Sequence, residues 1–159
     1  MPRTRNRTAP STRTSAPARA INLDFLPTLL GYNIRRAQIA LWRDFTRNVA
    51  DGEVRPGVFS VLLLANSNAG IAQIDIANQL AIDKASVVAL IDRLENQGWV
   101  VRKRSTEDRR RQEIFLTPAG EKAYKVLKRE MIEHERKFID RYTEAERKQL
   151  ISLLQRLHG

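Results

Sequence analysis

The sequence predicts a mostly α-helical protein that carries one small β-hairpin. Three observations lead to this prediction. Apolar residues recur every three or four positions over most of the chain, as they do on one face of a helix. Two of the predicted helices are short and are joined by a short turn. Directly after them, two short apolar stretches flank a basic loop, which is the pattern of two strands joined by a turn.

The charge of the chain is unevenly distributed. The 159 residues carry a net charge of +10, and they are enough for one domain with an additional arm. Residues 1–20 hold five arginines and no acid, whereas residues 102–111 hold six basic and two acidic residues. The other 129 residues are therefore nearly neutral. Charge confined in this way is typical of nucleic-acid-binding proteins. We expect residues 1–20, which also contain three prolines, to form a disordered cationic arm.

Composition argues against several other classes of protein. The absence of cysteine excludes disulfides and thiolate metal sites within the chain. No apolar run approaches the roughly 18 residues of a membrane span, and no signal-peptide core is present, so we expect a cytoplasmic protein with no membrane partner. With two histidines, a metal-sensing role is not expected. Phosphate loops, nucleophile elbows and zinc spacings are missing, so we expect neither an enzyme nor a cofactor.

The first predicted element is a long helix over residues 23–49. One of its faces repeats at helical spacing through Leu26, Leu30, Ile34, Ala37, Leu41 and Phe45. Leu29, Ile39 and Trp42 widen the apolar surface beyond that face, so we expect a partner chain as well as an intrachain core. Pro27 falls in the first turns of the helix, where proline is tolerated.

Three shorter helices follow. The second is predicted over residues 55–65, and the third over residues 71–80 with Ile74, Ala77 and Leu80 facing inward. Asp83 is a suitable N-cap for a fourth helix that ends near Gln97, before Gly98. The inner face of this fourth helix is formed by Val87, Leu90, Ile91 and Leu94. The third and fourth helices match a helix-turn-helix, although helix pairs of this length are common.

The predicted hairpin makes the assignment of a DNA-binding helix-turn-helix more specific. Strands over residues 99–103 and 113–116 would place the basic loop 104–112 beside the helix pair as a wing. Thr117 and Pro118 then occupy the N-cap and first position of another helix, to about Arg141. One stripe of that helix contains Leu127, Met131, His134 and Phe138, among which we expect the histidine to be packed. A capping box from Thr143 to Glu146 opens a last helix with Leu150, Leu153, Leu154 and Leu157.

The segment LENQGWVVRKRSTEDRRRQEIFLTPAGEKAY, residues 94–124, resembles the MarR family of winged helix-turn-helix regulators. The matching positions are Leu94, Gly98, Asp108-Arg109-Arg110, Leu116-Thr117 and Gly120. The resemblance extends over about residues 22–158 and leaves the arm outside. It implies a MarR-type domain over 21–159, with a winged helix-turn-helix at about 55–117. It also implies an obligate homodimer formed through helices at about 22–50 and 118–158, which would bind a pseudo-palindromic operator with half-sites about 34 Å apart.

Candidate DNA-binding residues lie on the fourth helix and the wing. Opposite its inner face, the fourth helix should expose Lys84, Ala85, Ser86, Val88 and Ala89. Of these, the lysine and serine can reach phosphates or base edges, whereas the apolar residues can contact thymine methyl groups. Arg93 either contacts a phosphate or pairs with a neighbouring acid. On the wing, the resemblance implies that Asp108 orients Arg110 for the minor groove, and Arg104 and Arg109 complete the set.

The resemblance also implies a small-molecule effector. Family members typically repress transcription, and many release DNA when an aromatic molecule binds. The candidate lining residues are Phe25, Leu29, Tyr32, Arg35, Arg36, Ile39, Trp42 and Phe59. For most of them, packing in the core or at the dimer interface is the favoured alternative. The two arginines would meet an anionic ligand group or pair with an acid of the other subunit.

The effector class is suggested by residues 23–45, LDFLPTLLGYNIRRAQIALWRDF. They resemble the first helix of members that sense aromatic catabolites, including hydroxycinnamoyl-CoA thioesters. The cationic arm would then serve either the CoA phosphates or the DNA. A rival hypothesis is a non-specific architectural DNA-binding protein, because the predicted recognition face is apolar and the arm is cationic. The ratio of affinity for the protein's own promoter to affinity for random DNA separates the two.

Overall fold

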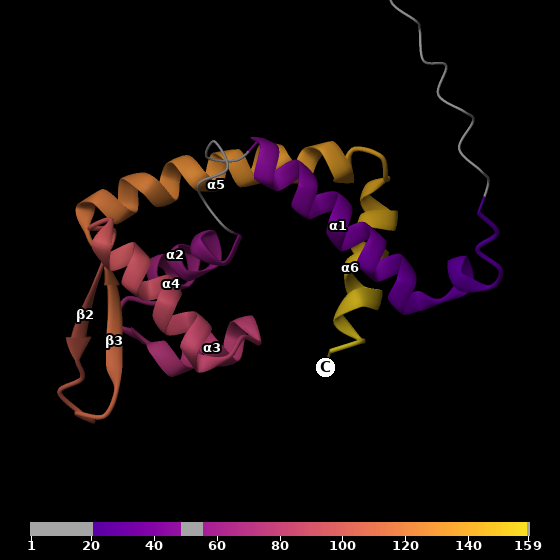
Figure 1. Ribbon diagram of the computed structural model, residues 1–159. Helices are drawn as coiled ribbons and strands as arrows, with labels where there is room; N and C mark the ends of the chain where they lie inside the picture. Colours follow the sequence, from indigo (N-terminus) through magenta and orange to yellow (C-terminus); the bar gives the residue numbers. More distant parts are fainter. Residues whose placement is uncertain (1–20, 49–55, 159) are drawn as a thin grey trace, which may run out of the picture. The chain divides into compact units, whose positions relative to one another are not determined.

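A computed structural model describes residues 21–48 and 56–158 of the chain. The predicted arm and the predicted end of the first helix lie outside these residues. The chain divides into two compact units between Arg35 and Arg36. The elements, labelled in Figure 1, are η1 (Leu26–Thr28), α1 (Leu30–Asn48), α2 (Pro56–Ser67), β1 (Ile71–Ala72), α3 (Gln73–Leu80), α4 (Lys84–Asn96), β2 (Val100–Arg104), β3 (Gln112–Leu116), α5 (Pro118–Ile139) and α6 (Glu144–Gln155). The predicted mostly helical fold with a small hairpin is confirmed.

The first unit contains the start of α1, and here the prediction of a helix from residue 23 was wrong. Pro27 lies in a short 3-10 turn, and the backbone of Leu29 is extended, with ψ of 126°. The extended residue Leu29 separates this turn from α1, so the long helix begins only at Leu30. The side-chain amide of Asn33 donates to the carbonyl oxygens of Pro27 and Leu29, each at 2.8 Å. The Leu29 carbonyl also accepts from the backbone N–H of Asn33 at 3.2 Å, so the side-chain amide adds a second bond there and supplies a partner for the Pro27 carbonyl.

In the second unit, side-chain caps begin three of the helices where the sequence predicts them. The Asp83 carboxylate accepts from the backbone N–H of Ser86 at the start of α4. At the start of α5, the Thr117 hydroxyl accepts from Gly120. The Thr143–Glu146 pair forms the predicted capping box of α6. Each cap satisfies a backbone N–H that would otherwise lack a partner in the first turn of a helix.

The sheet contains a strand that the sequence analysis missed. It is antiparallel with the order β1-β3-β2, and Val100 pairs with Leu116 at its base. Residues Ile71 and Ala72, predicted to begin a helix, instead form β1 and pair with Ile114 and Glu113. A two-residue strand exists only because β3 lies beside it, so a local pattern cannot reveal it. Figure 1 shows β2 and β3 as a hairpin beside α3 and α4.

The core of the second unit lies between its helices and the sheet. Fully buried side chains come from α2, α3, α4 and β3, and the largest are Leu62, Ile76, Ile91, Leu94 and Ile114. The inner face predicted for α4 is confirmed. On α3 the assignment was partly wrong, because Ile76 is fully buried whereas Ile74 is half-buried. The strand β1 moves the start of α3 to Gln73, two residues later than predicted, and the buried residues of α3 are Ile76 and Ala77.

Helices α5 and α6 leave much apolar surface uncovered. Helix α5 buries Tyr124, Leu127 and His134, but α6 buries no residue. The exposed large apolar residues at the end of the chain are Leu150, Ile151, Leu153, Leu154 and Leu157. Among the described residues, none of the helices is long and apolar enough to cross a membrane.

The predicted packing of His134 is confirmed. The His134 side chain is 4% exposed, and its ring makes edge contacts with Phe45 and Phe138. Its Nδ1 lies 2.9 Å from the Asp44 carboxylate, which also lies 3.2 Å from Lys137 Nζ. Because a carboxylate can only accept, His134 Nδ1 carries the proton. This hydrogen bond, followed by the Lys137 contact, lowers the pKa of Asp44.

Candidate nucleic-acid interface

The helix-turn-helix formed by α3 and α4 presents the predicted recognition face. Lys84, Ala85, Ser86, Val88 and Ala89 are all exposed. The hydroxyl of Ser86 donates to Asp83 Oδ2 at 2.6 Å and thus takes part in the cap of the helix. Together with the backbone N–H of Ser86, this hydroxyl lowers the pKa of Asp83, so the cap is charged at neutral pH. In this arrangement the serine hydroxyl can still accept a hydrogen bond from a base edge, while its proton is held by the cap.

The end of α4 is joined tightly to the wing. Gly98 has a positive φ of 68°, and its N–H donates to the carbonyl of Glu95. The next residue, Trp99, donates its N–H to the Leu94 carbonyl at 2.9 Å. This pair of bonds ends the helix at a left-handed residue, a position where glycine is strongly preferred. Strand β2 follows directly, so the recognition helix and the wing share a short backbone connection.

A single arginine side chain ties β2 to the recognition helix. Arg102 lies 2.5 Å from Asp92 and 2.8 Å from Glu95, both on α4. Its guanidinium also donates to the Val88 carbonyl at 3.2 Å, and its side chain is only 20% exposed. The planar guanidinium can serve several acceptors at once. Arg102 therefore belongs to the framework of the interface, although the sequence grouped it with the basic loop.

Backbone hydrogen bonds close the wing loop. The Asp108 carboxylate accepts from the backbone N–H of Arg110 at 2.9 Å, and the Asp108 carbonyl accepts from the N–H of Arg111 at 2.8 Å. The carbonyl of Arg111 accepts in turn from Ser105. Over the described residues, the bond that links Asp108 with Arg110 is thus made to the backbone and not to the guanidinium. The acid shapes the turn that carries the arginine side chain.

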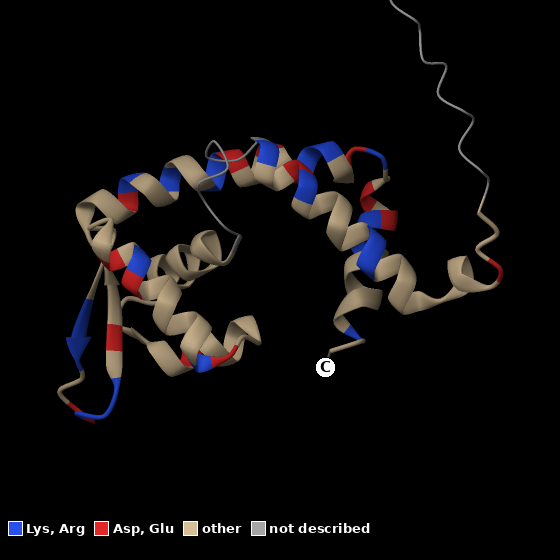
Figure 2. Cartoon of the chain, in the orientation of Figure 1, with Lys and Arg blue, Asp and Glu red and all other residues tan. Residues whose placement is uncertain are grey.

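The six basic residues of β2 and the loop, within residues 102–111, divide into two groups. Arg102 and Arg111 pair with acids, and Lys103 lies over the Phe115 ring at 4.8 Å from its centroid. The remaining three, which are exposed and form no ion pair within the described residues, are Arg104, Arg109 and Arg110. Figure 2 shows the basic residues of β2 and the loop at the free end of the hairpin. These three side chains are available to an external anion.

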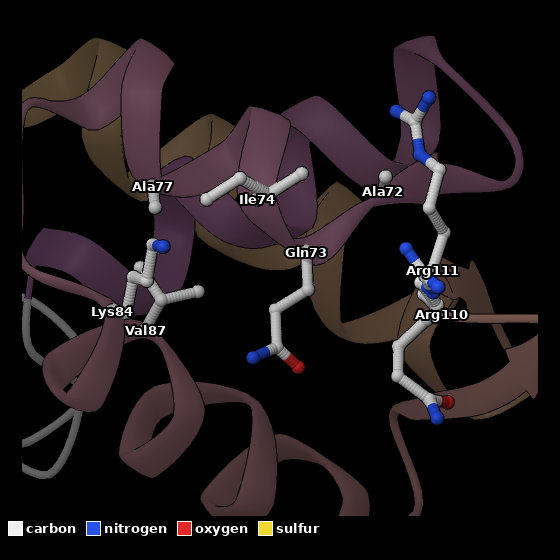
Figure 3. A pocket seen from close by; sticks show the side chains of 9 residues that line it. Ala72, Gln73, Ile74, Ala77, Lys84, Val87, Arg110 and Arg111 are labelled. Atoms are coloured by element: carbon white, nitrogen blue, oxygen red, sulfur yellow. The ribbon is translucent and has the colours of Figure 1, made fainter.

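A cavity lies between the recognition helix and the wing. It has a volume of about 270 Å³ and is lined by residues of α3, the start of α4 and the wing. Its lining residues are Ala72, Gln73, Ile74, Ala77, Lys84, Val87, Arg110, Arg111 and Gln112. Figure 3 shows Lys84 on one side of it and the two arginines on the opposite side, with Gln73 between them. The cavity is therefore a largely apolar hollow with cations on two sides.

Arg93 is the remaining candidate on α4. Its side chain is half-buried and has an interaction partner within the chain. Among residues 21–48 and 56–158, no group of acidic and histidine side chains is arranged to hold a metal ion.

The predicted effector-binding residues fall in both units. Phe25, Leu29, Tyr32 and Arg35 belong to the first unit, and the phenylalanine is 63% exposed. The other four belong to the second unit and are Arg36, Ile39, Trp42 and Phe59. The Phe59 ring stacks on Tyr124 with centroids 6.2 Å apart, and Trp42 is 49% exposed. None of the eight lines the cavity beside the wing.

Comparisons with known proteins agree with this geometry. The sequence model of the MarR family matches residues 56–111, which comprise α2, the helix-turn-helix and most of the wing. A candidate transcriptional regulatory protein for the hcr operon of Thauera aromatica is 36% identical over 130 residues. The match covers 81% of this chain and 78% of that protein. The chain belongs to the MarR family. This MarR-family protein is a DNA-binding transcriptional regulator and not an enzyme.

Two solved structures extend the comparison. The transcriptional repressor CouR bound to a 23-mer DNA duplex is 34% identical to this MarR-family protein, with a TM-score of 0.83. That match covers 89% of this chain and the whole of the CouR chain. CouR bound to p-coumaroyl-CoA is likewise 34% identical, with a TM-score of 0.77, and covers 87% of this chain and 97% of the other. The winged helix-turn-helix fold is thereby established for this MarR-family protein.

Sequence reasoning missed the side-chain bridges that hold the wing. Asp92 and Glu95 are three residues apart and therefore lie on one face of α4, which was the available signal for the site of Arg102. The bridge from Arg111 to Asp75, 36 positions apart in the chain, leaves no comparable local pattern. The cavity could not be inferred either, because it depends on the distance between the wing and α3.

Proposed function

We propose that this protein is a homodimeric, operator-specific repressor that an aromatic acyl-CoA thioester releases from DNA. The observation that carries the proposal is the similarity to CouR, at 34% identity over most of both chains. CouR is a transcriptional repressor with structures bound to a DNA duplex and to p-coumaroyl-CoA. The effector we propose is therefore a hydroxycinnamoyl-CoA thioester or a close aromatic analogue.

The proposed DNA contacts come from two surfaces. The exposed face of α4 would lie in the major groove, where Lys84 can reach phosphates and Val88 can contact thymine methyl groups. The wing would place Arg110 and its exposed neighbours at the minor groove, where the negative potential is high. Because the helix face offers few hydrogen-bonding groups, the shape of the duplex would supply much of the specificity.

The uncovered apolar surface of α6 supports the proposed homodimer. Five large apolar side chains near the end of the chain are at least 40% exposed, and α6 buries none of its residues. A contiguous apolar surface of this kind marks an interaction site in soluble proteins. A second copy of the chain is the proposed partner, which would also pair two recognition helices on one duplex.

The proposed effector is an anion with an aromatic end. Arg35 is exposed on α1, and the half-buried ring of Tyr32 lies three residues before it. A CoA thioester carries phosphates that a guanidinium binds well. Residues 1–20 carry five further arginines, and we propose that they contact either the CoA phosphates or the DNA backbone.

The proposal is tested by measuring DNA binding with and without candidate effectors. A duplex from the region upstream of the gene is titrated with the protein at physiological salt, beside a random duplex of equal length. We expect a clear preference for the upstream duplex, and its loss on addition of p-coumaroyl-CoA. Free p-coumarate and CoA alone are the controls. If no aromatic thioester shifts either the binding or the thermal midpoint, the effector class is wrong.

A matched pair of variants tests whether Arg35 contacts the effector. Arg35→Gln should weaken the response to the thioester, whereas Arg129→Gln, which removes the same charge from α5, should leave it unchanged. Both variants should retain their affinity for DNA in the absence of the thioester. An equal response in the two variants would exclude Arg35 from the effector site.

The alternative function is a non-specific architectural DNA-binding protein. It is favoured by the apolar character of the exposed recognition face, where three of the five predicted contacts are alanine or valine. Specific regulators bind their sites about 10³-fold or more tightly than random DNA. An affinity ratio near one in the titration above would support the architectural alternative.

A further inference from the structure

Across the described parts of the chain, the wing loop forms one ion pair with the helix-turn-helix. The Nη2 atom of Arg111 lies 2.6 Å from Asp75 Oδ2, in the first turn of α3. Pairing between β1 and β3 ends at Glu113. In the part of the chain that the structure describes, the other hydrogen bonds of residues 105–111 stay within the loop. Among the described residues, the ion pair with Asp75 is therefore the polar contact that links the loop to the helix-turn-helix.

The position of Arg111 makes this contact important for the shape of the wing. Its backbone N–H and carbonyl both bond within the loop, to Asp108 and Ser105, so the residue closes the loop where it joins β3. Its side chain reaches outward to α3 and does not point freely into solvent. A displacement of this side chain therefore displaces the whole turn that carries Arg110.

The two strands of the hairpin have different anchors. Arg102 holds β2 to α4 and has a mostly buried guanidinium. The Arg111–Asp75 pair holds the β3 side to α3, and both side chains are about half-exposed, at 47% and 50%. Across the cavity from Arg111 lies Lys84, on the recognition helix (Figure 3). The ion pair thus joins the wing to α3 beside the cavity that Lys84 also lines.

We infer that Asp75 is a positioning residue for DNA binding, which acts through Arg111 to hold the wing against the helix-turn-helix. This inference rests on the proposed function of the wing as a DNA contact. An acid close to DNA repels phosphates, so by charge alone the loss of Asp75 would strengthen binding. If the acid positions the wing, its loss weakens binding instead. The two mechanisms predict opposite signs.

The main test is the DNA affinity of Asp75→Asn, measured on the upstream duplex without effector. We expect about fivefold weaker binding, the factor that corresponds to the upper range for an exposed ion pair. Glu107→Gln is the matched control, because it removes the same charge from the wing tip without breaking an ion pair. It should leave the affinity unchanged or raise it. Unchanged or tighter binding by Asp75→Asn would overturn the inference.

A charge exchange separates positioning from direct contact. The double variant Asp75→Arg with Arg111→Asp keeps the net charge and can form the same bridge in reverse. We expect it to bind DNA more tightly than either single variant, with thermal midpoints similar in all of them. If Arg111 itself contacts DNA, the exchange will not restore binding and the inference fails. If the wild-type protein shows no preference for the upstream duplex, the proposed function is refuted but the inference about Asp75 is not. The affinities of the Asp75 variants and the wild type can still be compared on any duplex that the protein binds.

Discussion

Replacement of Gly120 by alanine should destabilise the protein through one close backbone contact. A Cβ atom at this position would lie 1.9 Å from the carbonyl oxygen of Trp99, whereas real Cβ atoms keep at least 3.0 Å. The difference, 3.0 minus 1.9, requires the start of α5 and the start of β2 to separate by about 1.1 Å. Both partners are backbone, so no side-chain rotation relieves the clash.

The expected loss of stability follows from three contributions. Overpacking in a well-packed region costs about 1–3 kcal/mol. Separation of α5 from β2 also weakens the N-cap hydrogen bond from the Gly120 N–H to Thr117 Oγ1, which is 3.0 Å long in the wild-type structure. Loss of such a cap costs about 1 kcal/mol. Higher helix propensity of alanine offsets up to about 1 kcal/mol. We expect the free energy of unfolding to fall by about 1–3 kcal/mol.

Urea denaturation at a fixed protomer concentration measures this loss, because the stability of an oligomer depends on concentration. The matched control is Gly31→Ala near the start of α1, where an added Cβ meets nothing within 4 Å. The control should be neutral or slightly stabilising. A loss below about 1 kcal/mol for Gly120→Ala would refute the reasoning, since it would show that α5 and β2 can separate cheaply.

Three further predictions concern the wing, the packed histidine and the dimer. Asp108→Ala should weaken operator binding although it removes a negative charge. Arg110→Ala should weaken binding and also reduce the steepness of the plot of log affinity against log salt by about 0.9. A steeper plot for Arg110→Ala would contradict the proposed contact between Arg110 and DNA. Asp44→Asn should cost about 1 kcal/mol at pH 7 through the bond to His134. Folding lowers the pKa of Asp44, so the difference in free energy of unfolding between wild type and variant should be fully present above the ordinary aspartate pKa of about 4. It should vanish as the pH falls through the lowered pKa of the folded state. Urea titrations at a series of pH values measure this difference. Leu154→Glu on α6 should yield monomers by size-exclusion chromatography with light scattering, and a dimer of unchanged strength would exclude α6 from the interface.

Local rules explain which parts of the fold the sequence predicted well. Asp83, Thr117 and Thr143 cap helices through atoms at most three residues away, so a short sequence window contains the whole interaction. Gly98 likewise ends α4 through its own backbone conformation. These positions were predicted correctly because the physical cause and the sequence signal coincide.

The predictions failed where the structure of a residue depends on a partner far away in the sequence. Ile71 resembles the start of a helix in sequence, but pairing with Ile114 draws it into the sheet. Asp75 carries no sign that its partner lies 36 positions away. For the candidate site, the exposed face of α4 follows from helical periodicity alone. The division of the basic loop into anchoring and free side chains depends on tertiary contacts that no periodicity encodes.

The backbone around Trp99 has a mechanical consequence for signalling. Its N–H bonds to the last turn of α4, and its carbonyl accepts from Thr117 at 3.0 Å, just before α5. The Thr117 hydroxyl donates to the neighbouring carbonyl of Gly98 at 2.6 Å. These bonds link the end of α4 and the start of β2 to the end of β3 and the start of α5, so we expect a tilt of α5 to be transmitted to the recognition helix. The amides of Trp99 and Thr117 should accordingly exchange with deuterium as one cooperative unit.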